Sequence, residues 1–312
     1  MTRADMNETR IAPELWLANS LGITPRLSTI ERNEFIKEVK GAFFSEIERL
    51  LKEAGQLRPP IDPTQLFGSR KIDKMTSSDD VFEHGKLLVS PSGFSIVVST
   101  RISGTHARFV IAHEICHTFF YDLSKTPPVL GFEKTSENQE VLEGLCSEGA
   151  RHILMPDKEF REWCSKISFP NGKAILGGMN KFLVSAELLI RRLREFHQRK
   201  WSVGFIFISY KLHHGVREFT VDKVYKVNLR PKDKFSRKSS PITSAETIGL
   251  LNEAIDSRLI TKDWGDKAVR IGSYEHTGFP VSFLRLSELR EQIVLILPRH
   301  NIRYSETKLM TN

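Results

Sequence analysis

Hydrophobic residues in the first two thirds of the chain recur at helical spacing. Between residues 31 and 54 they return every three or four positions, and the pattern ends near Gly55. This spacing gathers them on one side of a helix, so we expect an amphipathic helix there. The same reasoning predicts helices over residues 107–120, 137–155 and 185–196.

Strand-like patterns are of two kinds. Residues 87–89 and 94–99 are short apolar runs on either side of a turn at Pro91-Ser92-Gly93, which predicts a hairpin. From Trp201 onward, hydrophobic and polar residues alternate. This alternation predicts strands over residues 203–210, 219–229 and 293–297.

The change of period at Trp201 suggests two domains, and 312 residues are enough for two cores. We therefore expect an α+β fold. An N-terminal extension of residues 1–30 would precede a helical domain with a small sheet, residues 31–200. A smaller β-rich domain, residues 201–312, would follow a boundary close to Lys200.

The composition, the lengths of the apolar runs and the cysteines indicate in which cellular compartment the protein is found. Hydrophobic residues at 40% and charged residues at 27% are typical of folded soluble proteins. No apolar run approaches the roughly 18 to 20 residues of a membrane span, and the first 19 residues do not resemble a signal peptide. The cysteines Cys116, Cys146 and Cys164 are an odd number and form no disulfide framework. We expect a cytoplasmic protein.

The formal net charge is +8, and much of it lies between Lys211 and Lys238, where nine Lys or Arg face three acids. Such a block can attract nucleic acid or an acidic partner. Apolar residues interleave with the basic ones, which favours a solvated sheet face. Direct nucleic-acid binding through Lys211 to Lys238 stays open as an alternative.

The chemistry of the chain centres on the run His113-Glu114-Ile115-Cys116-His117, which has the form H-E-x-x-H. Residues four apart on a helix share a face, so both imidazoles can reach one ion. Zinc suits such a site, with three protein ligands and a fourth position for water. Glu114 would then act as the general base. The alternative is a pair of hydrogen-bonded helix histidines, but apolar flanks make unpartnered imidazoles costly there.

A third ligand should come from the next helix. Glu143 is our first choice because Gly144 beside it would permit close approach of the backbones. Glu140, one turn earlier, is the reserve. The acids within reach along the chain are Glu133, Glu137, Glu140, Glu143 and Glu148.

Several ordered motifs resemble the ImmA/IrrE family of zinc metallopeptidases. The family's R-F-x-x-A-H-E-x-G-H, E-x-x-A and L-L-M-P motifs find counterparts at residues 108–117, 143–146 and 153–156. A P-x-D-P run at 60–63 and a V-S-x-x-A…R-L helix from Val184 to Leu193 also resemble the family, so the likeness covers about residues 35–196. By this resemblance, His113, His117 and Glu143 would be the metal ligands and Glu114 the catalytic glutamate.

The chain departs from the family pattern at three positions. Cys116 stands where glycine is usual, Cys146 where alanine is usual, and Tyr121 at a position that is often histidine. The cysteines replace one small residue by another, so the site can survive them; a thiol pair near the metal is the alternative to buried filler. Tyr121 would either hydrogen-bond a tetrahedral intermediate or pack against the core.

The resemblance implies a zincin-like, zinc-dependent metallopeptidase that hydrolyses a peptide bond in a regulatory protein, such as a helix-turn-helix repressor. No helix-turn-helix pattern is evident in this chain, so the repressor would be a separate chain. The alternative is a non-catalytic zincin-fold module that sequesters a transcriptional regulator. The sequence leaves the role of the C-terminal domain open.

Overall fold

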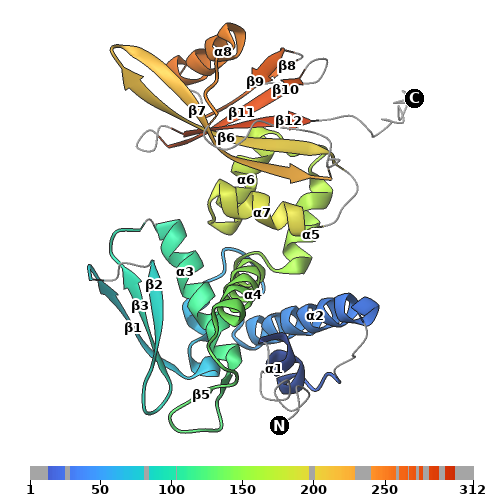
Figure 1. The fold of residues 1–312 in the computed structure, drawn as a ribbon, viewed down its shortest axis with the longest axis vertical. Coiled ribbons are helices and arrows are strands. Elements are labelled where there is room, and N and C mark those ends of the chain that lie inside the picture. The colour runs from blue at the N-terminus through green and yellow to red at the C-terminus, as the bar shows by residue number, and fades with distance from the viewer. Residues whose placement is uncertain are drawn as a thin grey trace, which may run out of the picture. The chain divides into compact units, whose positions relative to one another are not determined.

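The computed structural model describes residues 13–24, 29–80, 84–102, 104–196, 201–228, 240–257, 260–265, 267–271, 274–276, 281–287 and 292–298. The chain divides into two compact units (Figure 1). Unit 1 comprises Met1–Cys164 with Lys181–Val184, and unit 2 comprises Ser165–Asn180 with Ser185–Asn312. Unit 1 combines helices with a small sheet and unit 2 is rich in strands, so the predicted α+β fold class is confirmed.

The sheet of unit 1 has three strands in the order β1-β3-β2. They are β1 (Ile72–Ser78), β2 (Gly85–Val89) and β3 (Phe94–Ser99). β2 and β3 form the predicted hairpin, whereas β1 runs parallel to β3. The central strand β3 is buried on both faces, with Phe94 and Ile96 at 0% exposure on one and Ser95 and Ser99 buried on the other. β2 lies at an edge of this sheet, which is important for the site described below.

Three long helices complete the core of unit 1. They are α2 (Thr29–Glu53), α3 (Gly104–His117) and α4 (Ser136–Leu154), and α4 packs against both α3 and α2. Thr135 caps the start of α4 by accepting a hydrogen bond from the backbone of Asn138. The smaller elements are α1 (Pro13–Ser20), the 3-10 turns Pro63–Leu66, Gly68–Arg70 and Thr118–Phe120, the short strands β4 (Tyr121–Asp122) and β5 (Val129–Leu130), and α5 (Asp157–Lys166).

Close packing of α4 against its neighbours depends on Gly149. A Cβ atom at this position would lie 2.7 Å from the sulfur of Cys116 and 2.9 Å from the ring of Phe43. A Cβ atom at Gly144 would meet nothing within 4 Å, because that residue faces solvent. The expectation that Gly144 permits the close approach is therefore wrong, and Gly149, five residues later on the buried side of α4, has that role.

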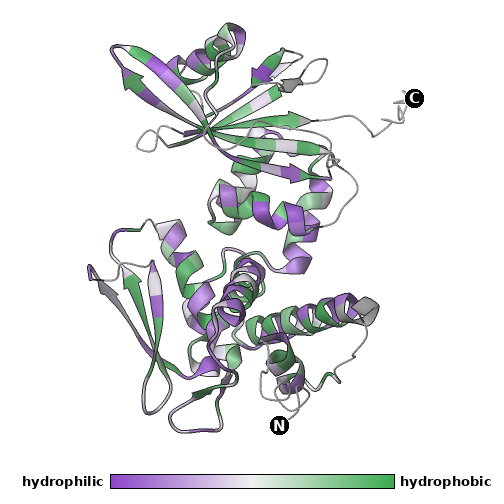
Figure 2. Cartoon of the chain, viewed as in Figure 1, coloured by the Kyte–Doolittle hydropathy of each residue, from purple (hydrophilic) through white to green (hydrophobic). Residues whose placement is uncertain are grey.

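Unit 2 is built on a five-stranded antiparallel sheet in the order β7-β6-β12-β11-β8. β12 is hydrophobic along its length, whereas β7 alternates (Figure 2). Residues 293–297 of β12 are all fully buried, as expected for a central strand covered on both faces. The strands are β6 (Val203–His213), β7 (Val216–Val227), β8 (Thr261–Gly265), β11 (Val281–Ser287) and β12 (Gln292–Pro298), and β9 (Val269–Ile271) pairs with β10 (Tyr274–His276) in a second small sheet.

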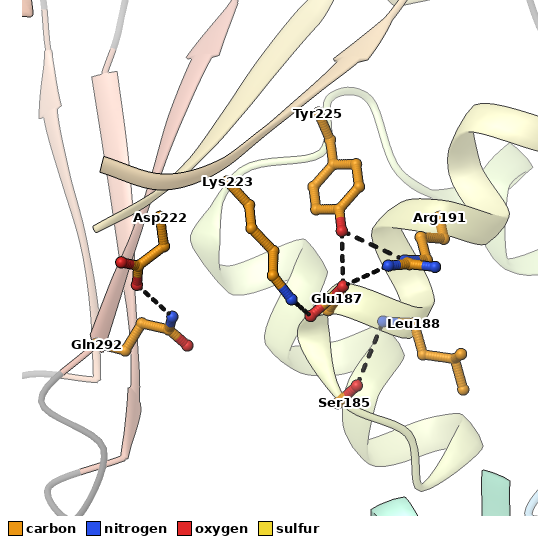
Figure 3. Close-up of polar contacts among 8 residues, drawn as sticks. All are labelled: Ser185, Glu187, Leu188, Arg191, Asp222, Lys223, Tyr225 and Gln292. Atoms are coloured by element: carbon orange, nitrogen blue, oxygen red, sulfur yellow. Dashed lines mark hydrogen bonds and ion pairs between the residues drawn. The ribbon is translucent and has the colours of Figure 1, made fainter. Parts of the chain in front are cut away.

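The helices of unit 2 are α6 (Gly172–Phe182, with its last two residues in unit 1), α7 (Ala186–Glu195) and α8 (Ala245–Asp256). A polar cluster joins α7 to β7 (Figure 3). Glu187 accepts hydrogen bonds from Lys223 (2.7 Å), Tyr225 (2.6 Å) and Arg191 (2.8 Å). Ser185 caps the helix through the backbone of Leu188.

The sequence predicts α7 as a helix over residues 185–196, in the domain that precedes the predicted boundary at Lys200. In the structure α7 belongs to unit 2. Lys200, Leu229 and most of the extension 1–30 lie outside the described residues. The division into independently folding domains at residue 200 stays a prediction. Within the ranges described, no helix is both long and apolar enough to span a membrane.

Candidate metal centre

Helix α3 directs His113 and His117 to one point. Their Nε2 atoms lie 3.1 Å apart, as the spacing of four residues on one helix face predicts. Both side chains are mostly buried, at 14% and 13% exposure. Because the two Nε2 atoms lie this close together, both are available as ligands to a single metal ion.

Glu143 of α4 completes the group. Its carboxylate lies 2.9 Å from Nε2 of His113 and 3.5 Å from Nε2 of His117. The three side chains form a group whose ligand atoms all lie within 4.8 Å of one another. Tetrahedral zinc with ligands near 2.1 Å requires ligand separations of about 3.4 Å, so these residues fit that ion. Glu140, the reserve, is exposed and is not part of the group.

Two neighbours orient these side chains, and neither was predicted. Gln139 donates to Glu143 Oε1 at 2.7 Å, and the hydroxyl of Ser147 lies 3.4 Å from Nδ1 of His113. They stand four residues before and four residues after Glu143 on α4, so helical spacing from Glu143 could have found them. Such outer contacts fix the orientation of metal-binding side chains.

The charge on Glu143 is favoured by its partners. Hydrogen bonds from His113 and then His117 hold the pKa of this carboxyl far below its usual range. Glu143 is therefore a carboxylate over the physiological pH range, which is the form that binds a cation.

Glu114, next to His113 on α3, lies in the same pocket and beside β2. It is 7% exposed, and burial raises the pKa of its carboxyl against the opposing effect of His117 and His113. A backbone hydrogen bond from Leu87 reaches it from β2. The strand can come this close because residue 85 is glycine: a Cβ there would lie 2.2 Å from Val110. Nothing in the local sequence pattern of β2 indicates this role of Gly85.

An open pocket of about 570 Å³ connects these groups. Glu114, Glu143 and both candidate metal-binding histidines line it, as does Tyr121. Tyr121 also packs edge-on against Phe94, and burial raises the pKa of its hydroxyl. Both expected roles of this tyrosine, packing and contact with a bound molecule, are compatible with its place. The other lining residues are His84, Gly85, Lys86, Leu87, His106, Phe109, Val110, Leu130, Lys134, Gln139 and Leu142.

The outer edge of β2 borders this pocket. Ser90 exchanges two backbone hydrogen bonds with Gly93, and the carbonyl of His84 accepts one from the Ser99 N–H, so the backbone N–H and C=O groups of the even-numbered residues of this strand point toward β3. The backbone groups of Gly85, Leu87 and Val89 consequently point to the other side. Among the described residues, β2 has no strand on that side. An extended peptide could pair there.

The two cysteines that depart from the family pattern, Cys116 and Cys146, are fully buried and not in a disulfide. Burial raises the pKa of both thiols, which disfavours the thiolate form that binds metals or reacts. Cys116 fills the space over Gly149. Buried filler is the interpretation that these contacts favour.

Two further motifs that carried the resemblance meet in the structure. Arg108 of α3 donates a hydrogen bond to the carbonyl of Ile61, in the Pro60-Ile61-Asp62-Pro63 run. Asp62 in turn caps the short turn that follows, through the backbone of Thr64. The start of α3 is therefore anchored to the segment before the sheet.

Part of the chain matches a known protein family, and a solved structure is similar to it. Residues 69–194 match the family model of the IrrE N-terminal-like domain, a peptidase family. A solved structure of a Mycobacterium tuberculosis transcriptional regulator is similar over 92% of this chain and 81% of that chain, with 16% identity and a TM-score of 0.46. No curated protein matches the chain.

Proposed function

Residues 69–194 belong to the ImmA/IrrE family of peptidases, and from this premise we propose that the protein is a zinc-dependent metallopeptidase that hydrolyses a peptide bond in a regulatory protein. The observation that carries the proposal is the convergence of His113, His117 and Glu143 beside Glu114 in one open pocket. A buried structural zinc site would be closed by a fourth protein ligand, whereas this one leaves a side open to a substrate.

Zinc held by His113, His117 and Glu143 would polarise the scissile carbonyl and lower the pKa of a water toward about 7. Glu114 would take the proton of the attacking water and then deliver it to the leaving nitrogen. The raised pKa of its buried carboxyl supports the first step, because a stronger base takes the proton of the attacking water more readily.

The substrate would lie along β2. The outward backbone groups of Gly85 and Val89, together with the Leu87 carbonyl, can add an extended peptide to the sheet, and the Leu87 N–H binds the proposed base. This arrangement favours a polypeptide over a compact small molecule. The family resemblance further suggests a helix-turn-helix repressor, in a separate chain, as the substrate.

The test uses the purified full chain. Elemental analysis should give one zinc per chain, and incubation with helix-turn-helix repressors and with casein should give cleavage that chelation stops and zinc restores. Glu114→Gln should keep zinc and repressor binding while cleavage falls at least about 100-fold, the scale of general-base loss. If Glu114→Gln relieves repression in a reporter strain as fully as the parent protein, cleavage is not the biological act and sequestration replaces it.

A further inference from the structure

A second pair of imidazoles lies in the same pocket, apart from the candidate metal ligands. His84, just before β2, and His106, on the first turn of α3, have ring centroids 4.4 Å apart at an angle of 55°. Both line the pocket. His84 is exposed and His106 is partly exposed, so hydrophobic burial does not explain the pair.

The position of this pair relative to the metal centre follows from helix geometry. His106 precedes His113 by two turns, which places it on the same face of α3 and about 10 Å away along the helix axis. On the strand, His84 lies three residues before Leu87, about 10 Å at strand rise, and one residue before Gly85, where an added Cβ would lie 3.7 Å from Glu114 Oε1. The pair therefore lies to one side of the candidate metal ligands, where it can contact a neighbouring substrate residue.

The charges of the pocket indicate what kind of residue that would be. Apart from Glu114 and Glu143, which the proposed reaction uses, the ionisable side chains near its rim are basic: His84, Lys86, His106 and Lys134. No third carboxylate lines the pocket among the residues that the structure describes. Zinc would add two further positive charges. The pocket is therefore complementary to an acidic side chain.

We propose that His84 and His106 form a subsite for an Asp or Glu side chain about two to three residues from the scissile bond, at 3.3 Å per residue of extended peptide. Imidazole N–H groups donate hydrogen bonds to carboxylates. Lys86 adds charge beside His84. A peptide antiparallel to β2 would place the acidic residue on the C-terminal side of the cleaved bond.

This inference rests on the proposed function, so its experiment separates the two. In the first arm, immobilised Glu114→Gln protein is incubated with paired peptide mixtures that carry Glu or Gln at one fixed position, and bound peptides are counted by mass spectrometry. In the second, the parent protein cleaves fluorogenic peptides from the same mixtures. Glu should be preferred over Gln about tenfold at one position, the scale of a charged hydrogen bond. The preference should appear in KM and not in kcat, because the subsite is remote from the reacting atoms.

Substitutions of His84 and His106 test whether these two residues cause the preference for Glu over Gln. His84→Gln and His106→Gln should each reduce it to less than about threefold, because each removes one of the two proposed donors to the carboxylate, with zinc content unchanged. His213→Gln, an exposed histidine of unit 2, should leave it intact. Should His106→Gln misfold, the exposed His84 still tests the proposal.

Acid-selective capture without any hydrolysis would support the subsite and reject the peptidase. Equal capture and cleavage of Glu and Gln peptides, failure to capture either, or a preference that survives both substitutions would overturn the subsite.

Discussion

Two clusters of polar side chains, one in each unit, are each centred on a helical glutamate, and they differ in what surrounds it. In unit 2, Glu187 is bound by Lys223, Tyr225 and Arg191, all of which donate hydrogen bonds (Figure 3). In unit 1, the partners of Glu143 are Gln139, which donates one hydrogen bond, and two imidazoles whose Nε2 atoms lie only 3.1 Å from each other.

The difference lies in the balance of donors and acceptors. The Glu187 carboxylate has its charge compensated by side chains that bring their own protons, so the cluster is complete. Around Glu143, imidazole rings can offer nitrogen lone pairs as well as N–H groups, so a cation can bind between them and the carboxylate. A completed cluster joins a helix to a sheet, whereas an incomplete one is available for a ligand.

The largest effect should come from removing one imidazole. His113→Ala takes away a proposed ligand, and we expect loss of stoichiometric zinc and at least about 100-fold lower cleavage, beyond the 10- to 100-fold typical of outer contacts. Elemental analysis after dialysis and a cleavage assay measure this. His213→Ala is the matched control, because His213 is 65% exposed in unit 2. Full zinc content in His113→Ala would contradict the site.

Zinc should stabilise the two clusters unequally. At a zinc concentration 100 times its Kd, linkage contributes about 2.7 kcal/mol to the unit that binds it. Hydrogen exchange followed by mass spectrometry should then slow in α3 and α4 and stay unchanged in α7 and β7. The same measurement on His113→Ala should show no slowing. Equal protection of both regions would mean that zinc does not act at the proposed centre.

The packing that holds α4 against α3 can be changed without touching a ligand. Gly149→Ala places a methyl group within 2.7 Å of the Cys116 sulfur and 2.9 Å of the Phe43 ring, both in a fully buried core. Overpacking of this kind costs about 1 to 3 kcal/mol of unfolding free energy, and we expect weaker zinc binding with it. Urea unfolding and zinc titration provide the measurements.

Gly144→Ala is the control for that substitution. It lies on the same helix, its new methyl group would meet nothing within 4 Å, and higher helix propensity should stabilise it by up to about 1 kcal/mol. Equal effects of the two alanines would show that close packing at Gly149 is not what positions α4.

The smallest effect on stability should come from a substitution of Glu187, at the centre of the polar cluster in unit 2. Burial alone would raise the pKa of Glu187, but hydrogen bonds from Lys223 and Tyr225, with the charges of Lys223 and Arg191, outweigh it, and the pKa is lowered. Glu187→Gln should therefore destabilise unit 2 by about 1 kcal/mol at pH 7, with zinc content unchanged.

The pH dependence of this substitution has a definite sign. A carboxyl whose pKa is lower in the folded state contributes stability above its unfolded pKa of about 4.3, and loses it as the pH falls through the folded pKa. The difference between parent and Glu187→Gln in urea unfolding should hence shrink steadily below about pH 4. A difference that grows on acidification would contradict this assignment.

Much of the fold was accessible from the sequence. Periodic hydrophobic positions predicted the helices that became α2, α3, α4 and α7, and alternation predicted β6 and β7. The ImmA/IrrE resemblance is confirmed over residues 69–194. β1 was missed because only Ile72 of its seven residues is buried, so it carries no alternation. The role of Glu143, the reaction and the substrate stay predictions.

By itself, the sequence determined which side chains on one helix share a face, because helical spacing is fixed by backbone geometry and needs no other part of the chain. His113 and His117 follow from it. Only the tertiary structure decided that Glu143 and not Glu140 meets them, that Gly149 and not Gly144 lets the helices approach, and that His84 contacts His106. Those pairs join different elements, and which faces meet depends on how whole helices and strands pack together.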